Sequence, residues 1–136
     1  MSELGSCLQV LDLQSNLFEK LPDEIGSLKQ LRVLHLSHNK LKKLPDSLGD
    51  LALLQTLDVS HNCLKDVPES LSKLHRLKTL DISHNSKLKK LPKCLAQCRS
   101  MDKLVLDNSS ITYPPSNVCS EGTEATMKFL CKGKSV

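Results

Sequence analysis

The tripeptide Ser-His-Asn occurs three times in this chain, and each copy begins 23 residues after the one before it. The copies begin at Ser37, Ser60 and Ser83. Aligning the chain on this asparagine gives five similar units, and one residue inserted after Asn85 lengthens the fourth unit to 24. We place the units at residues 8–30, 31–53, 54–76, 77–100 and 101–115. A repeat of this length predicts a solenoid, because each unit can bury its apolar surface only against its neighbours.

Leucine occupies fixed places in each unit. Leu34 and Leu36 lie two residues apart, so on a strand both side chains point to the same face of the sheet. Aromatic residues make up only 2% of the chain, so the core must consist mainly of leucine. We therefore expect five parallel strands, spaced about 4.8 Å apart, over a continuous leucine core. Further leucines close the second unit, at Leu41, Leu44, Leu48 and Leu51.

Asparagine and proline form two further columns. An inward-facing carboxamide donates and accepts at once, so it can satisfy the backbone groups that lose their ladder partners where a strand ends. Proline favours a sharp bend, and we expect short 3₁₀ or α turns on the convex side rather than long helices. In the fifth unit Ser109 takes the place of the asparagine. The two columns are Asn16, Asn39, Asn62 and Asn85, and Pro22, Pro45, Pro68, Pro92 and Pro115.

The two ends of the repeat array differ. Little sequence precedes the first strand, and a solenoid needs a polar cap there, so we expect upstream repeats to be missing through truncation or a short isoform. We predict that residues 116–133 form a C-terminal cap with a final helix. Thr123 is the expected N-cap of this helix, and Gly133 is its expected end. We treat residues 1–136 as one domain. The helix would cover the last layer with Thr126, Met127, Phe129 and Leu130.

From Leu8 to Pro115 the units resemble the leucine-rich repeat, whose pattern is Leu-x-x-Leu-x-Leu-x-x-Asn-x-Leu. The resemblance implies an α/β fold, a right-handed horseshoe-shaped solenoid of five parallel strands with a C-terminal capping helix. It also implies a module for protein–protein interaction, without catalytic activity of its own.

The C-terminal segment narrows the resemblance. It contains Tyr113-Pro114-Pro115, Val118-Cys119, Gly122-Thr123 and Phe129-Leu130-Cys131-Lys132. These residues are similar to the end of the repeat domain in the leucine-rich-repeat and sterile-alpha-motif family of RING-type ubiquitin ligases. Similar caps close other cytoplasmic leucine-rich-repeat proteins. The resemblance implies a partner- or substrate-recognition domain in the ubiquitin conjugation pathway, with the catalytic RING outside this chain.

Composition sets the remaining limits. The chain has no long apolar run and no signal-peptide pattern, so we expect a cytoplasmic protein without stable membrane insertion. Its six cysteines lack the paired spacing of a zinc site, and we interpret them as small buried apolar residues. A net charge of +4 favours solubility without requiring nucleic acid. We expect a monomer that holds no metal and no cofactor.

The concave face is the expected binding site, since repeat proteins present the outward residues of their strands there. Alternation along the strands places alternate side chains of each unit on this face. The acidic residues among them favour a basic or hydrogen-bonding protein or peptide. The candidate residues are Asp12, Gln14, His35, Ser37, Asp58, Ser60, Asp81, Ser83 and Asp107, with His38, His61 and His84 along the rim.

Two other surface features leave alternatives open. The three rim histidines could form a ladder that binds a metal or merely stacks, and a serine hydrolase would need an oxyanion hole that the sequence does not supply. A lysine stripe on the flank could meet an anionic surface, such as a phospholipid or RNA. It comprises Lys42, Lys43, Lys65, Lys89 and Lys90. A free-standing scaffold or signalling adaptor of the Ras-associated leucine-rich-repeat type is the alternative to a ligase domain.

Overall fold

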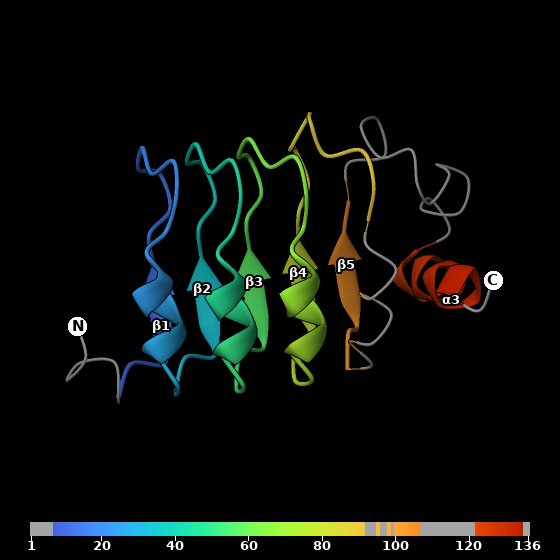
Figure 1. Ribbon diagram of the computed structural model, residues 1–136, viewed down its shortest axis with the longest axis horizontal. Coiled ribbons are helices and arrows are strands. Elements are labelled where there is room, and N and C mark those ends of the chain that lie inside the picture. The colour runs from blue at the N-terminus through green and yellow to red at the C-terminus, as the bar shows by residue number, and fades with distance from the viewer. Residues whose placement is uncertain (1–6, 92–94, 96–97, 99, 107–121, 135–136) are drawn as a thin grey trace.

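The computed structural model describes residues 7–91, 95, 98, 100–106 and 122–134, and for residues 131–134 only the backbone. Within these residues the repeat units build one sheet of five parallel strands in chain order (Figure 1). Each strand pairs with the next at equivalent repeat positions, as Leu34 pairs with Leu57. The predicted α/β solenoid is confirmed. The strands are β1 (Val10–Asp12), β2 (Val33–His35), β3 (Thr56–Asp58), β4 (Thr79–Asp81) and β5 (Lys103–Val105).

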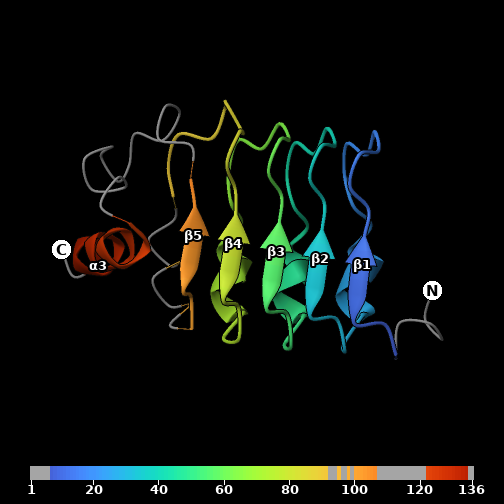
Figure 2. The same ribbon diagram turned by 180° about the vertical axis from the view of Figure 1, so that it is seen from behind.

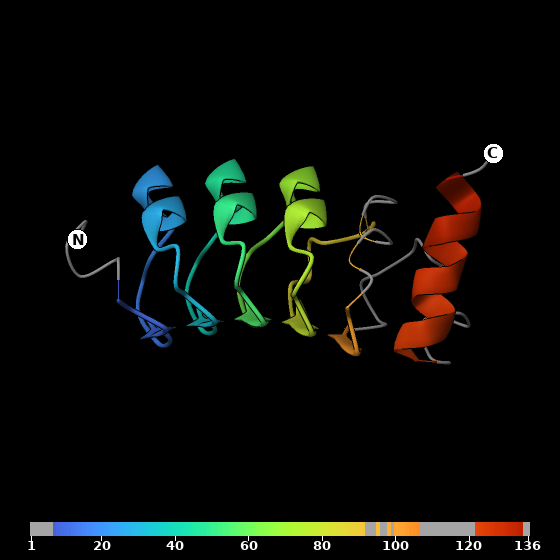
Figure 3. The same cartoon turned by 90° about the horizontal axis from the view of Figure 1, so that it is seen from below.

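Short 3₁₀ helices cover the convex side of the first three units: η1 (Asp23–Ser27), η2 (Asp46–Asp50) and η3 (Glu69–Lys73). Each follows a proline of the predicted column, and the proline carbonyl accepts the first hydrogen bond, as Pro45 does from the Leu48 amide at 3.2 Å. Figure 3 shows these helices in one layer and the strands in the other, with the strands closer together along the stack. The predicted 3₁₀ turns are confirmed for these units, whereas Pro92 and Pro115 lie outside the described residues.

The core is the predicted leucine stack. Leu34, Leu57 and Leu80 of the central strands are fully buried. The leucines that open these units, Leu31, Leu54 and Leu77, are fully buried as well. A buried leucine side chain contributes about 1.5–3 kcal/mol relative to an exposed one. Because leucine recurs at the same repeat position in successive units, each internal unit packs its leucines against both neighbours and stabilises them.

The asparagine column forms the predicted ladder. The Asn62 carboxamide donates to the carbonyls of Leu36, Val59 and Ser60 at 3.0, 3.0 and 2.9 Å, and its oxygen accepts from the Leu41 amide at 3.1 Å. Asn39 and Asn85 repeat this arrangement in their own units. Each of these side chains therefore joins its own unit to the preceding one. Asn16 is exposed and bonds only within its own unit, and Ser109 lies outside the described residues.

Glycines let the 3₁₀ helices approach closely. A Cβ atom added to Gly49 would lie 2.5 Å from the backbone oxygen of Ser70, and one on Gly26 would lie 2.6 Å from that of Ser47. Real Cβ atoms do not approach other atoms so closely, so η1, η2 and η3 pack at a separation that only glycine permits at these two positions. Residue spacing alone did not predict this contact.

The final helix, α3 (Thr123–Lys134), packs against β5 at the end of the stack (Figure 1). Thr126 and Leu130 are buried and Met127 packs against the core, as predicted, while Phe129 is half-buried. Two boundary predictions were wrong. Gly122 caps the helix, and the Thr123 hydroxyl instead accepts a 2.8 Å hydrogen bond from the Leu104 amide. The helix also continues through Gly133 to Lys134.

The cysteines divide into different environments. Cys98 is buried, as predicted. Cys7 is exposed and Cys63 is only half-buried, so the buried interpretation was wrong for these two. Cys63 follows an asparagine of the ladder, in an outward position that Lys40 occupies one unit earlier. The residue type alone does not show which cysteines are buried, because the position of each cysteine within its repeat unit decides whether it faces solvent.

Candidate functional site

Figure 2 shows the sheet from the side opposite the 3₁₀ helices. The outward-facing residues of the strands form two columns on this concave face. In the centre, Thr56 pairs with Thr79 and Asp58 pairs with Asp81, while Leu57 between them points into the core. The alternation predicted from sequence therefore holds. The columns are Val10, Val33, Thr56, Thr79 and Lys103, and Asp12, His35, Asp58, Asp81 and Val105. Asp107, the remaining candidate of this face, lies outside the described residues.

The two central aspartates are held in place by serines two residues further along. One oxygen of Asp58, Oδ1, accepts from the Ser60 hydroxyl at 2.7 Å and from its amide at 3.1 Å. Asp81 Oδ1 accepts from Ser83 in the same way at 2.6 and 3.0 Å. Because one oxygen of each carboxylate is committed, the orientation of the other is fixed as well. Asp58 Oδ2 lies 4.0 Å from Nδ1 of His35 on the neighbouring strand.

The serines themselves differ from expectation. Ser37, Ser60 and Ser83 were predicted to face solvent, but they retain only 4%, 5% and 7% of their exposure. They do lie on the predicted side of the sheet, where a neighbouring side chain covers each hydroxyl: a carboxylate for Ser60 and Ser83, and the Gln14 amide oxygen, at 3.2 Å, for Ser37. The alternation of side chains along a strand predicts which face of the sheet a residue lies on, but not how far neighbouring side chains bury it. Their observed role is to orient other side chains.

The first unit presents a more open version of the same arrangement. Asp12 and Gln14 are both exposed. The Gln14 amide donates to Asp12 Oδ1 at 3.1 Å, and the Gln14 side-chain nitrogen donates to Oδ2 at 3.0 Å. Both oxygens of this carboxylate therefore have an intramolecular partner. The described aspartates of the column thus differ in how much of the carboxylate remains open to a ligand.

The rim histidines form a continuous stack. His38, His61 and His84 are exposed, and adjacent rings lie 4.2 and 4.1 Å apart with interplanar angles of 12°. Their φ angles of 57°, 52° and 55° lie in the left-handed region, which histidine, asparagine and aspartate tolerate better than most residues. Strand pairing continues into the rim, since the His61 amide donates to the Ser83 carbonyl at 3.1 Å. The predicted column and its stacking alternative are therefore observed, whereas the left-handed backbone conformation was not predicted from sequence.

This stack is poorly arranged for either chemistry considered from sequence. The lone pairs of nearly parallel rings point in parallel directions, so they do not converge on one ion. Within the described residues, no group of three or more His, Cys, Asp or Glu side chains could hold a metal ion. The Ser60 and Ser83 hydroxyls donate their single proton to aspartate, so they are not hydrogen-bonded to a histidine base as a serine nucleophile would be.

The stack does perturb titration. The rings on either side crowd His61 although its edge is exposed, and this loss of hydration lowers the pKa of His61 below 6.5. Repulsion from the charged forms of His84 and His38 acts in the same direction, whereas Asp81 and Asp58 oppose it. Since the folded pKa lies below the unfolded value, the folded state binds fewer protons, and stability decreases as the pH falls below about 6.5.

We expect His61→Asn to reduce this pH dependence, because asparagine also tolerates the left-handed backbone and does not titrate. Thermal unfolding between about pH 7.5 and 5 should show the original chain losing more stability than the variant, by at most about 1 kcal/mol, since the rings are exposed and screened. Identical pH profiles for the two proteins would show that the lowered pKa of His61 does not affect stability.

The flank beyond the rim carries the predicted lysine stripe. Lys42, Lys43, Lys65, Lys89 and Lys90 are all exposed. Lys42 lies 3.5 Å from Glu19, and both side chains are largely exposed, so this ion pair contributes little to stability.

Comparison with known proteins identifies the class of this fold. The family described as "Leucine-rich repeat region" matches residues 3–121. The chain belongs to the leucine-rich-repeat family. No significant match to a curated protein was found. The predicted family is thus confirmed, whereas the comparisons provide no support for the narrower ligase resemblance.

Two solved structures are similar to this leucine-rich-repeat chain. One is a leucine-rich-repeat protein of Leptospira interrogans, with a TM-score of 0.64 and 32% identity over 82% of this chain and 34% of that protein. The other is the crystal structure of a TDR receptor, with a TM-score of 0.68 and 30% identity over 78% of this chain and 19% of the receptor. The chain therefore spans about a third or less of these proteins.

The leucine-rich-repeat fold generally serves as a non-catalytic module for protein–protein interaction. No helix among the described residues is long and apolar enough to span a bilayer.

Proposed function

We propose that this leucine-rich-repeat domain binds a basic or hydrogen-bonding segment of a partner protein on its concave face. The observation that supports this most strongly is the pair Asp58 and Asp81. Each carboxylate is held by a buried serine through one oxygen, and the two residues occupy paired positions on adjacent strands. Such preorganisation favours binding, because the side chains lose little conformational entropy when a partner docks.

The surroundings complete the proposed surface. Thr56 and Thr79 flank the aspartates on one side, and the histidine stack lies at the rim on the other. Five strands span roughly 20–25 Å, which suits a peptide or one face of a small domain. An interface of about 800 Å² per partner would require most of this face.

The test is a pull-down from cell lysate with the purified domain, read by mass spectrometry. Asp58→Lys with Asp81→Lys should reduce capture of a concave-face partner more than tenfold, because reversed charges repel a basic segment. Asp58→Asn with Asp81→Asn retains an acceptor for each serine while removing the charge, and we expect a smaller loss from it. The matched control is Asp23→Lys with Asp46→Lys, which reverses two exposed charges on the convex helices.

Circular dichroism should show that all of these variants remain folded. The proposal is wrong if capture survives the concave-face reversals. Loss of capture with Lys65→Glu and Lys89→Glu alone would instead move the binding site to the flank.

We further propose that the domain is the recognition part of a cytoplasmic ubiquitin ligase whose catalytic portion lies outside this chain. The support is the similarity of residues 113–132 to the end of that family's repeat domain. Sequencing of the transcripts tests it, since a coiled coil and RING cysteines should follow downstream. Transcripts that all lack them would leave a free scaffold or adaptor. Cell fractionation and light scattering would test the cytoplasmic location and the monomeric state.

A further inference from the structure

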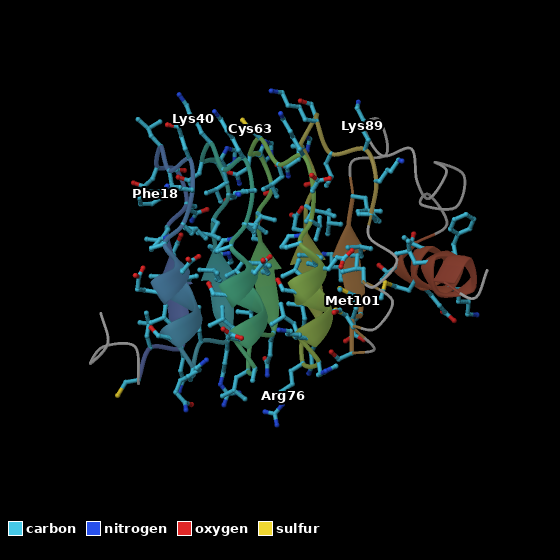
Figure 4. All side chains as sticks on the ribbon, viewed as in Figure 1. Phe18, Lys40, Cys63, Arg76, Lys89 and Met101 are labelled. Carbon is cyan, nitrogen blue, oxygen red and sulfur yellow. The ribbon has the colours of Figure 1, made fainter. Side chains whose placement is uncertain are left out.

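One edge of the solenoid carries a larger net positive charge than the whole chain does. It consists of the segments that follow each turn asparagine, residues 17–20, 40–43, 63–66 and 86–90, which we call the lysine flank. Its eight lysines and two acidic residues give a formal net charge of +6, whereas the entire chain carries +4. All eight lysines are exposed. Figure 4 shows Lys40 and Lys89 at this edge, with Arg76 at the opposite one.

The backbone of the lysine flank is held in register. The Lys40 amide donates to the Phe18 carbonyl at 2.9 Å, the Lys42 amide to Glu19 at 3.2 Å, and the Cys63 amide to Leu41 at 2.9 Å. The leucines between the lysines, such as Leu41, are buried in the core. The lysines therefore extend from a fixed row of backbone segments, so their charges act together on a broad surface placed against this edge.

The N-terminal end of the same edge is apolar. Leu17 is 75% exposed, and it occupies the outward position that Lys40 and Cys63 hold in the next two units. Lys40 is exposed and Cys63 is half-buried, so this position faces outward in the repeat. The adjacent Phe18 is 39% exposed, but it occupies the inward position of the buried Leu41 and Leu64, so its exposure belongs to the uncovered face of the first unit. An exposed leucine beside a lysine row combines the two interactions by which proteins associate with bilayer surfaces, apolar insertion and attraction to anionic lipids.

We propose that the lysine flank docks onto the surface of an anionic phospholipid bilayer, with Leu17 entering the headgroup region. Lysine suits this partner because it is a hydrated point charge on a flexible stem that can reach headgroups at different heights. RNA fits less well, since its recognition relies on arginine and stacking aromatic rings, and the flank contains no arginine and one partly exposed phenylalanine. Docking through this edge leaves the concave face open to a protein partner.

Sedimentation with vesicles tests the proposal. The protein should bind vesicles of phosphatidylcholine with about 30% phosphatidylserine and not phosphatidylcholine alone, and binding should weaken strongly between about 0.05 and 0.5 M NaCl. Each lysine near such a surface contributes about fivefold to the partition coefficient, so Lys40→Gln, Lys65→Gln and Lys87→Gln together should lower it about 100-fold. Leu17→Ser should lower it about tenfold.

Matched control variants show whether vesicle binding depends on where the lysines lie or only on the total charge of the protein. Lys29→Gln, Arg76→Gln and Lys78→Gln remove the same charge from the segments that lead into β2 and β4, the edge at which Figure 4 shows Arg76. All three side chains are exposed, and the changes should alter binding less than tenfold. Val10→Thr alters another exposed apolar residue and should have no effect. Equal losses from the two triple variants, or equal binding to neutral vesicles, would overturn the proposal. Binding to single-stranded RNA that requires the flank lysines, without vesicle binding, would replace it with RNA recognition.

Discussion

Replacing Asn62 with alanine is expected to lower the free energy of unfolding by about 3–4 kcal/mol, a large share of the 5–15 kcal/mol typical of a domain. The variant leaves the Leu41 amide without its acceptor and removes the donor shared by three carbonyls. These groups are buried, so water does not readily replace the lost bonds. Urea denaturation followed by circular dichroism measures the loss, and the melting temperature should decrease by about 10 °C.

Asn16→Ala is the matched control for this prediction. Asn16 occupies the same repeat position, but it is exposed and bonds only to carbonyls of its own unit. We expect its replacement to cost less than about 1 kcal/mol, because water can hydrogen-bond to the exposed groups. If both substitutions cost the same, the stabilising effect of asparagine would lie in the local turn and not in its bonds to the preceding unit.

Replacing Gly49 with alanine should destabilise the domain by about 2 kcal/mol, although alanine normally favours helical structure. The added Cβ would lie 2.5 Å from the Ser70 oxygen, so η2 and η3 would have to separate. A separation on the convex side disturbs the leucine contacts of both units. Thermal unfolding gives the stability change.

Ser72→Ala provides the comparison, since Ser72 occupies the position of Gly49 one unit later and already carries a Cβ atom. We expect a change within about 0.5 kcal/mol. A neutral Gly49→Ala variant would mean that the convex helices can separate without disturbing the core, and that the close approach contributes little to stability.

The sequence predicted the framework of the candidate site well, because its strongest signal is periodic. Equivalent residues recur every 23 positions, so one assignment, such as Leu34 inward and His35 outward, extends to every aligned unit. The same reasoning correctly placed the asparagine ladder, since Asn62 is the residue that can satisfy donors and acceptors at the strand end. These features depend on residue type and spacing alone.

Predictions failed where the answer depended on neighbouring units or on local geometry. Ser60 has the right parity for the concave face, yet the Asp58 carboxylate covers it. Gly133 is a common helix stop, but α3 continues past it. Cys63 was predicted to be buried because cysteine is a small apolar residue, but it occupies an outward column and is half-buried.

The sequence by itself determined the repeat length, the inward and outward faces of each strand, the leucine core and the asparagine column. Only the tertiary structure decided which polar side chains are covered, how the histidine rings are oriented and how closely the convex helices pack. The reason is physical. The spacing of residues along the chain specifies the face of the strand to which each side chain points. The burial of a side chain and its distance from its neighbours are set only when adjacent units stack and their side chains fill the same space.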